Sequence, residues 1–168
     1  ILTEADLKSE ELIINLIKKE FPEHNILSEE KGLINNHSDY TWIVDPLDGT
    51  INFSKSIPLF SISIGLKYKE EIILGVVYLP MADELFVAEK GKGAFLNNKV
   101  IHVSLINKLS DAYIAIDYKP IKECINKGID LMKILANKSF FVRAYSCQVI
   151  EFVYTACGRF DVSLCYST

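Results

Sequence analysis

The residues best suited to chemistry are two aspartates in the string WIVDPLDGTINF, which spans residues 42–53. The apolar residues 41–44 predict a short strand that ends at Asp45, and Asp48 follows in the same proline-containing turn. Two carboxylates held this close repel each other unless a cation lies between them. The string therefore indicates a divalent cation site, although the pattern DPxDG also occurs in ordinary turns.

The residues after Asp48 favour an anion beside that cation. Gly49 lets the backbone approach a ligand closely, and residues 50–52 can begin a helix. The free N–H groups of Gly49 and Thr50 at a helix start would suit an anion. A cation site beside an anion site is the arrangement that metal-assisted phosphoryl chemistry needs. Thr50 could instead be only a helix cap.

Length and composition limit the function classes. The 168 residues, 49% of them hydrophobic, predict one globular domain over 1–168. Lys and Arg number 18 against 22 Asp and Glu, and there is no basic block, which argues against nucleic-acid binding. The most apolar run, residues 72–80, is far shorter than the roughly 18 residues that span a bilayer, so we expect no membrane partner.

The four cysteines indicate a reduced protein. Cys124, Cys147, Cys157 and Cys165 form no CxxC pair and show no metal-finger spacing with the three histidines. A reducing compartment is the simpler interpretation, so we expect a cytoplasmic location.

Hydrophobic periodicity predicts an α/β fold that can position these residues. A helix over 3–20 is expected, capped by Thr3 with Asp6 three positions on, with an apolar stripe of Leu12, Ile13, Leu16 and Ile17. Strands are expected at 60–66 (buried on one face), 71–79, 84–88 and 99–104, with residues 97–98 as a hairpin turn. Further strands at 112–117, 139–145 and 160–166 alternate with helices at 120–136 and 147–157. Residues 31–39 are the most loop-like stretch, and 89–93 predict a hairpin bend rather than a phosphate loop.

The string WIVDPLDGTINF resembles the signature of the inositol monophosphatase family, within the magnesium-dependent, lithium-sensitive phosphatases. The upstream segments LTEADLKSEELI and FPEHNILSEEKG are similar to the two segments that precede it in the family. Downstream, SISIGL, ILGVVYLP, ELFVAEKGKGAFLN and TACGRFD follow the family order. The resemblance covers essentially all 168 residues. It implies a layered α-β-α-β sugar-phosphatase fold with a mixed, largely antiparallel sheet.

The resemblance also implies roles for individual residues. Glu29 matches a ligand of the first metal, Asp45 the carboxylate that bridges two Mg²⁺ ions, the Leu47 carbonyl a further ligand, and Asp48 a ligand of the second metal. Gly49 and Thr50 match the residues whose N–H groups hold phosphate, and Thr50 with Asp6 matches the pair that orients the attacking water. For Asp6 the alternative is a favourable charge in the first turn of a helix.

For the whole protein, the resemblance implies Mg²⁺-dependent hydrolysis of an inositol monophosphate-like phosphate monoester, two or three Mg²⁺ ions, inhibition by Li⁺, and a homodimer. The alternatives are a relative acting on fructose 1,6-bisphosphate, a nucleotide 3′-phosphate or NADP, or a non-catalytic regulatory protein that keeps the fold.

The sequence departs from the family pattern at several places. Ser28 stands where Gly is usual, and residues 146–149 replace a Gly-Ser/Thr-Ala-Ala run near the substrate hydroxyls. A helix before LTEAD and a Trp-Asp motif that supplies a third carboxylate to the second metal are not among the 168 residues. We therefore expect the N-terminal metal- and phosphate-binding part of such an enzyme, with N- and C-terminal parts missing.

Overall fold

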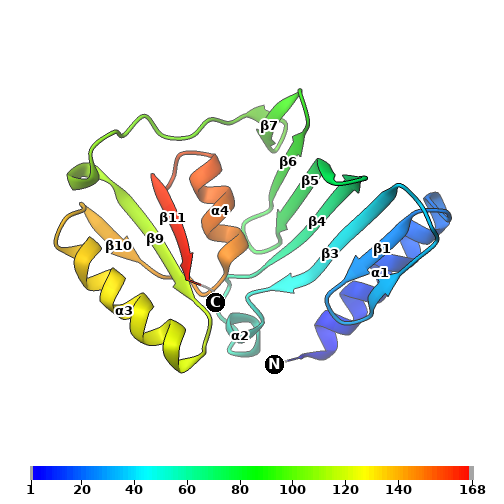
Figure 1. The fold of residues 1–168 in the computed structure, drawn as a ribbon, viewed down its shortest axis with the longest axis horizontal. Helices are drawn as coiled ribbons and strands as arrows, with labels where there is room; N and C mark the ends of the chain where they lie inside the picture. Colours follow the sequence, from blue (N-terminus) through cyan, green and yellow to red (C-terminus); the bar gives the residue numbers. More distant parts are fainter. Residues whose placement is uncertain (1, 167–168) are drawn as a thin grey trace. The chain divides into compact units, whose positions relative to one another are not determined.

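The computed structural model describes residues 2–166, and the chain forms two compact units, Ile1–Val100 and Ile101–Thr168. Each unit combines helices with one sheet (Figure 1), which confirms the expected α/β class with a mixed, largely antiparallel sheet. That the two units act as a single domain stays a prediction. No helix within residues 2–166 has the length and apolarity needed to span a membrane.

The first unit holds two helices, α1 (Glu4–Glu20) and α2 (Thr50–Ser54), and an eight-stranded sheet. Its strands in chain order are β1 (Asn25–Ser28), β2 (Gly32–Ile34), β3 (Tyr40–Asp48), β4 (Ser61–Tyr68), β5 (Glu71–Leu79), β6 (Glu84–Glu89), β7 (Gly93–Leu96) and β8 (Lys99–Val100). They lie in the order β2-β1-β3-β4-β5-β6-β7-β8. Neighbours are antiparallel except β1 and β3, which are parallel.

The second unit is a small parallel sheet with helices between its strands. After a 3₁₀ turn, η1 (Leu109–Asp111), the elements are β9 (Tyr113–Tyr118), α3 (Lys122–Ala136), β10 (Phe141–Arg143), α4 (Gln148–Ala156) and β11 (Val162–Tyr166). The sheet order is β10-β9-β11 with parallel pairing throughout. Parallel neighbours need a crossover, and α3 provides it between β9 and β10. The expected alternation of strands and helices is confirmed here, with ends that differ by at most two residues.

Helix α1 begins as the sequence predicts, but its buried face differs from the expected one. Thr3 is the N-cap, and its side chain and that of Asp6 form a capping box. The buried residues of α1 are Asp6, Glu10, Ile14 and Ile17, whereas Leu12 is 63% exposed and Leu16 is 53% exposed. The predicted stripe is therefore half right, because Ile17 is buried and Ile13 packs against the core. The two buried acids are positions that apolar periodicity does not indicate.

Strands β1, β2 and β7 were not predicted, and β2 lies inside the stretch expected to be a loop. The buried side chain of Asn25 stabilises this stretch through hydrogen bonds, which apolar periodicity cannot reveal. Its side-chain Nδ2 donates to the Ser38 carbonyl at 2.7 Å, and its Oδ1 accepts from the Asn36 N–H at 2.8 Å. This side chain fixes the return from β2 to β3.

The hairpins of the first unit follow the turn residues. Asn97 and Asn98 both have positive φ, 46° and 64°, and join β7 to β8 as expected. The strand predicted over 99–104 is wrong beyond Val100, where β8 ends. Residues 62–67 of β4 are all half-buried, so the expected single buried face is also wrong. The predicted bend at 89–93 is confirmed, with positive φ at Gly91 between β6 and β7 and at Gly93, the first residue of β7.

A small hydrophobic core joins α1 to the strands that carry the acidic residues. Its buried members are Ile14, Ile17, Ile26 and Val44. Ile26 lies on β1 two residues before Ser28, and Val44 precedes Asp45 directly. The positions of the acidic side chains therefore depend on this core.

Replacement of Ile26 by alanine should lower the free energy of unfolding by about 2–5 kcal/mol, because the fully buried side chain leaves a cavity. The control is Leu27→Ala on the same strand, because Leu27 is 43% exposed. Urea unfolding of both variants measures the difference. Equal losses at the two positions would contradict the assigned core.

Candidate active site

Asp45 and Asp48 lie on an irregular strand end rather than on the tight turn that the sequence suggested. β3 continues through both residues, and its pairing with β4 shifts between Asp45↔Ser63 and Asp48↔Ser61. Three steps on β3 oppose two on β4, so one extra residue is accommodated as a bulge. Pro46 favours this irregularity because it has no N–H for the ladder. The bulge, not a turn, places the two carboxylates.

Gly49 lies between β3 and helix α2 as the N-cap of that helix, and the helix begins at Thr50 as expected. Its φ of 87° is left-handed, a conformation that glycine adopts without strain. α2 then covers Thr50–Ser54, and the first N–H groups of a helix have no acceptor within it. Residues 50–54 are thus helical, which is the condition for an anion site at Gly49 and Thr50.

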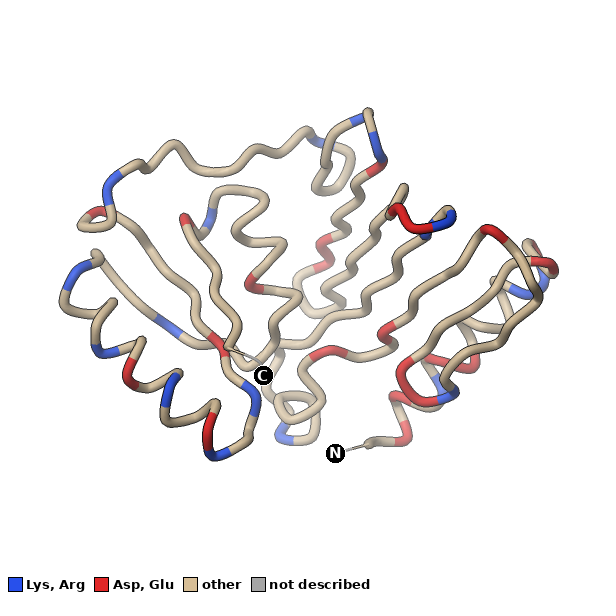
Figure 2. The backbone as a smooth tube through the Cα atoms, viewed as in Figure 1, with Lys and Arg blue, Asp and Glu red and all other residues tan. Residues whose placement is uncertain are grey.

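Strand pairing brings Glu29 to Asp45. β1 runs parallel to β3 with Ser28 opposite Val44, and the Glu29 N–H continues the ladder by donating to the Val44 carbonyl at 3.3 Å. The side chains of Glu29 and Asp45 share a hydrogen bond. Two carboxyl groups this close can reach one ion. Figure 2 shows acidic segments at the start of α1, after β1 and at the end of β3 on one side of the first unit.

The electrostatics of the acidic cluster, which consists of Glu29, Asp45 and Asp48, are those of crowded like charges. Burial, then the charges of Asp48 and Glu29, raises the pKa of Asp45 to about 7, and the Leu47 N–H that donates to Asp45 Oδ1 at 3.1 Å only partly opposes this. Burial, followed by repulsion from Glu30, also raises the pKa of Glu29. The charged neighbours that raise both pKa values are acids, so the cluster is stabilised by protons or by a metal cation.

The donor set of the cluster fits a hard divalent cation. Carboxylate and carbonyl oxygens are the ligands of Mg²⁺ and Ca²⁺, and the cluster offers carboxylates beside the Leu47 carbonyl. Within residues 2–166, no three His, Cys, Asp or Glu side chains already stand in the arrangement of a metal site. Without a cation, mutual repulsion opposes such an arrangement. Glu29, Asp45, Leu47 and Asp48 as metal ligands therefore remain a prediction.

Asp6 and Thr50 lie close together across 44 residues of sequence. The Thr50 hydroxyl donates to the Leu47 carbonyl at 3.1 Å, and it lies 3.5 Å from Asp6 Oδ1, near the limit of a hydrogen bond. Asp6 Oδ2 accepts from the Thr3 N–H at 2.8 Å and from the Thr3 hydroxyl. The capping role of Asp6 is thus evident, and its role with Thr50 toward water stays a prediction.

Two further residues of α1 contact the same segments, and neither was predicted from the sequence. The Ser9 hydroxyl donates to the Pro46 carbonyl at 3.0 Å, inside the bulge of β3. Glu10 is fully buried and accepts hydrogen bonds from the turn that carries Glu29. The available signal was their spacing, because positions three and four residues after Asp6 share its helix face.

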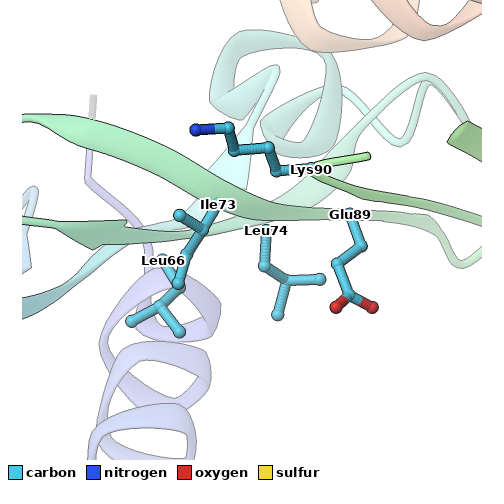
Figure 3. Close-up of a pocket in the computed structure, with 5 residues that line it drawn as sticks. All are labelled: Leu66, Ile73, Leu74, Glu89 and Lys90. Carbon is cyan, nitrogen blue, oxygen red and sulfur yellow. The ribbon is translucent and has the colours of Figure 1, made fainter. Parts of the chain in front are cut away.

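A pocket over β4–β6 lies apart from the acidic cluster. It is lined by Leu66, Ile73, Leu74, Glu89 and Lys90 (Figure 3). Its two charged side chains point in different directions in Figure 3, and each already has an ion-pair partner: Glu89 with Lys92 at 2.6 Å, and Lys90 with Glu71. No predicted site residue lines it.

Residues 146–149, which replace a glycine-containing run of the resembled family, precede and begin α4 in the second unit. Ser146 has a φ of 54°, the left-handed region that favours glycine, and Cys147 is the N-cap of α4. The backbone conformation that suits glycine is thus present with serine in its place.

Comparisons with known proteins bear on the family and the fold of this chain. The family model described as the inositol monophosphatase family matches residues 1–167. An inositol monophosphatase of Dictyostelium discoideum is 37% identical over 169 residues, covering 96% of this chain and 61% of that protein. The Nus factor SuhB of Vibrio cholerae is 38% identical over 166 residues, covering 95% of this chain and 61% of that protein.

A solved structure is similar over the same extent. The extragenic suppressor protein suhB from Bartonella henselae has a TM-score of 0.89 and 36% identity, covering 95% of this chain and 62% of that chain. The present chain thus spans about 61% of the length of the curated relatives it matches.

The metal-free protein should become less stable as the pH rises from about 4, where an unfolded aspartate titrates, to about 7, where folded Asp45 titrates. The raised pKa means that the folded state holds a proton that the unfolded state has released, so this stabilisation is complete below the lower pKa and is lost through the upper one. Asp45→Asn should therefore gain stability relative to the unaltered protein between pH 5 and pH 8.

Urea unfolding across that pH range, with metal removed by a chelator, measures the difference. The control is Asp39→Asn, because Asp39 is an exposed residue paired with Lys69 at 3.8 Å. A difference between Asp45→Asn and the unaltered protein that stays constant with pH would show that Asp45 has an ordinary pKa.

Proposed function

Because the chain belongs to the inositol monophosphatase family, we propose that the protein is a phosphatase that hydrolyses a phosphate monoester with the help of Mg²⁺. The observation that carries the proposal is the hydrogen bond between Glu29 and Asp45, with Asp48 near enough to raise the pKa of both. Acidic side chains placed close together near a helix start repel one another, and a bound cation would offset that repulsion. The proposed substrate is an inositol monophosphate-like ester.

In this proposal the chain's own residues divide the work. Glu29, Asp45, the Leu47 carbonyl and Asp48 hold Mg²⁺, which when bound activates water and stabilises the leaving oxygen. The N–H groups of Gly49 and Thr50 bind the phosphate at the start of α2.

Thr50 and Asp6 orient the attacking water. The Thr50 hydroxyl has one proton, which it now donates to the Leu47 carbonyl. If the Leu47 carbonyl binds the metal instead, the Thr50 hydroxyl can turn toward Asp6 Oδ1, which lies 3.5 Å from the hydroxyl oxygen. Thr50 can then accept a hydrogen bond from water while Asp6 fixes its orientation, as general base catalysis requires.

A panel of phosphate monoesters tests the proposal. The panel contains an inositol monophosphate, fructose 1,6-bisphosphate, a nucleotide 3′-phosphate and NADP, each assayed with and without Mg²⁺. We expect hydrolysis that requires Mg²⁺, is greatest with the inositol monophosphate and is inhibited by Li⁺. Preference for another ester would change the substrate only, and a purified full-length protein that hydrolyses none of them would leave the regulatory alternative.

Asp45→Asn should lower Mg²⁺ affinity by more than the about 10- to 100-fold that loss of an outer-shell partner costs, because Asp45 is proposed as a direct ligand of two ions. Titration of Mg²⁺ against activity and isothermal titration calorimetry measure the loss. Asp39→Asn again serves as the control. Unchanged Mg²⁺ affinity in Asp45→Asn would remove Asp45 from the metal site.

Thr50→Val should lower kcat at saturating Mg²⁺ by about 10²- to 10⁴-fold, the usual contribution of a positioned proton-transfer group. Thr50→Ser keeps the hydroxyl and should retain most of the rate. Steady-state kinetics of both variants decide the matter. Comparable kcat values for the valine and serine variants would show that the Thr50 hydroxyl takes no part in catalysis; the alternative role as a helix cap was wrong, because Gly49 is the N-cap of α2 and no side chain caps it.

A further inference from the structure

Glu10 is a buried acid that the proposed chemistry does not use. It lies on α1, one turn after Asp6, and its side chain has no exposed surface. Burial of an acid is costly unless its oxygens are satisfied by donors. Its contacts therefore indicate why the chain keeps a carboxyl group at this place.

Within residues 2–166, the hydrogen bonds to the Glu10 carboxyl group all reach one of its oxygens. Glu10 Oε1 accepts from the Glu30 N–H at 3.2 Å, from the Lys31 N–H at 3.0 Å, and from the Ser28 hydroxyl. These donors lie on both sides of Glu29. The carboxyl group of Glu10 thus fixes the turn between β1 and β2 to helix α1.

The other oxygen of the Glu10 carboxyl group, Oε2, does not hold the turn. Among the residues that the structure describes, Glu10 Oε2 is a buried side-chain oxygen without a hydrogen-bond partner. The nearest opposite charge is Lys31 Nζ, 3.9 Å away on a side chain that is 46% exposed. The position therefore needs one well-placed acceptor, and an amide of the same shape could supply it.

We propose that Glu10 is a positioning residue, which holds the backbone on either side of Glu29 so that the Glu29 carboxyl group meets Asp45. Ser28 takes part through its hydroxyl, which a glycine at that position could not provide. In this role Glu10 acts through Glu29 and touches neither the proposed ion nor the substrate. This inference rests on the proposed metal site, because it assigns the geometry of one of that site's ligands.

The test compares three substitutions on α1. Glu10→Ala removes the acceptor, and we expect Mg²⁺ affinity to fall by about 10- to 100-fold, as for other outer-shell partners of metal ligands. Glu10→Gln keeps an acceptor oxygen and places its amide where Oε2 has no partner, so it should lose much less. Glu11→Ala removes the same charge from the exposed neighbouring position and should change nothing.

Two readouts besides activity separate positioning from general stability. Calorimetric titration with Mg²⁺ gives the affinity of each variant, at a temperature where circular dichroism shows it to be folded. Amide hydrogen exchange of the metal-free protein gives the protection of the Glu30 and Lys31 N–H groups, which should fall in Glu10→Ala but not in Glu11→Ala. If Glu10→Ala does not fold, Ser28→Ala, which removes one of the three donors, should still weaken Mg²⁺ binding measurably.

The outcomes distinguish this inference from the proposed function. Equal Mg²⁺ affinity in Glu10→Ala and the unaltered protein would overturn the role of Glu10 and leave the metal site intact. Equal losses in the alanine and glutamine variants would also overturn it, because the acceptor geometry would then be irrelevant. If the unaltered protein binds no Mg²⁺, the metal site and the inference both fail.

Discussion

Repulsion among carboxylates is the interaction on which the rest of this structure depends. Asp45 and Asp48 lie on β3 and Glu29 directly follows the neighbouring strand β1, and burial together with the like charges raises the pKa of Asp45 to about 7. A fold gains no stability from ionised acids placed in this way, because each carboxylate loses water and faces another carboxylate. The arrangement becomes favourable when a divalent cation with a preference for oxygen ligands is shared among them. The fold thus places carboxylates where their mutual repulsion favours the binding of Mg²⁺.

Helix α1 is the element that holds this unfavourable arrangement together. Asp6, Ser9 and Glu10 lie on one face of the helix, at spacings of three and four residues. They contact, in turn, Thr50, the Pro46 carbonyl, and the turn that carries Glu29. One rigid element therefore sets the relative positions of two segments that are far apart in sequence, residues 28–31 and residues 46–50. The apolar half of the same face, Ile14 and Ile17, fixes the helix to the sheet.

The sequence could predict the local features, because local features follow from residues that are near each other. The capping box of α1, the strand into Asp45, the helix after Gly49 and the asparagine hairpin all follow from short patterns. The bulge in β3 could not be predicted, because it depends on pairing with β4, about 15 residues away in the chain. Strand β1 was not predicted because it is stabilised by the buried side chain of Asn25 and by pairing with the parallel strand β3. Neither contact produces a periodic pattern of apolar residues in the sequence.

The residues of the candidate site also differ in whether short sequence patterns could predict them. Asp45, Asp48, Gly49 and Thr50 could be proposed from their spacing alone, whereas Glu29 and Asp6 required the family resemblance, since nothing local marks them as partners of Asp45 and Thr50. Ser9 and Glu10 were missed because a polar residue on a helix normally faces water. Their burial is visible only once α1 lies against the sheet.

The most direct test of the account is proton release on Mg²⁺ binding, measured by calorimetry in two buffers of different ionisation enthalpy. If the cation replaces protons in the acidic cluster, binding at pH 6 should release protons and binding at pH 9 should release almost none, because Asp45 titrates at about 7 in the metal-free protein. Binding that releases no protons at either pH would contradict the account, because the cluster would then be fully ionised without its cation.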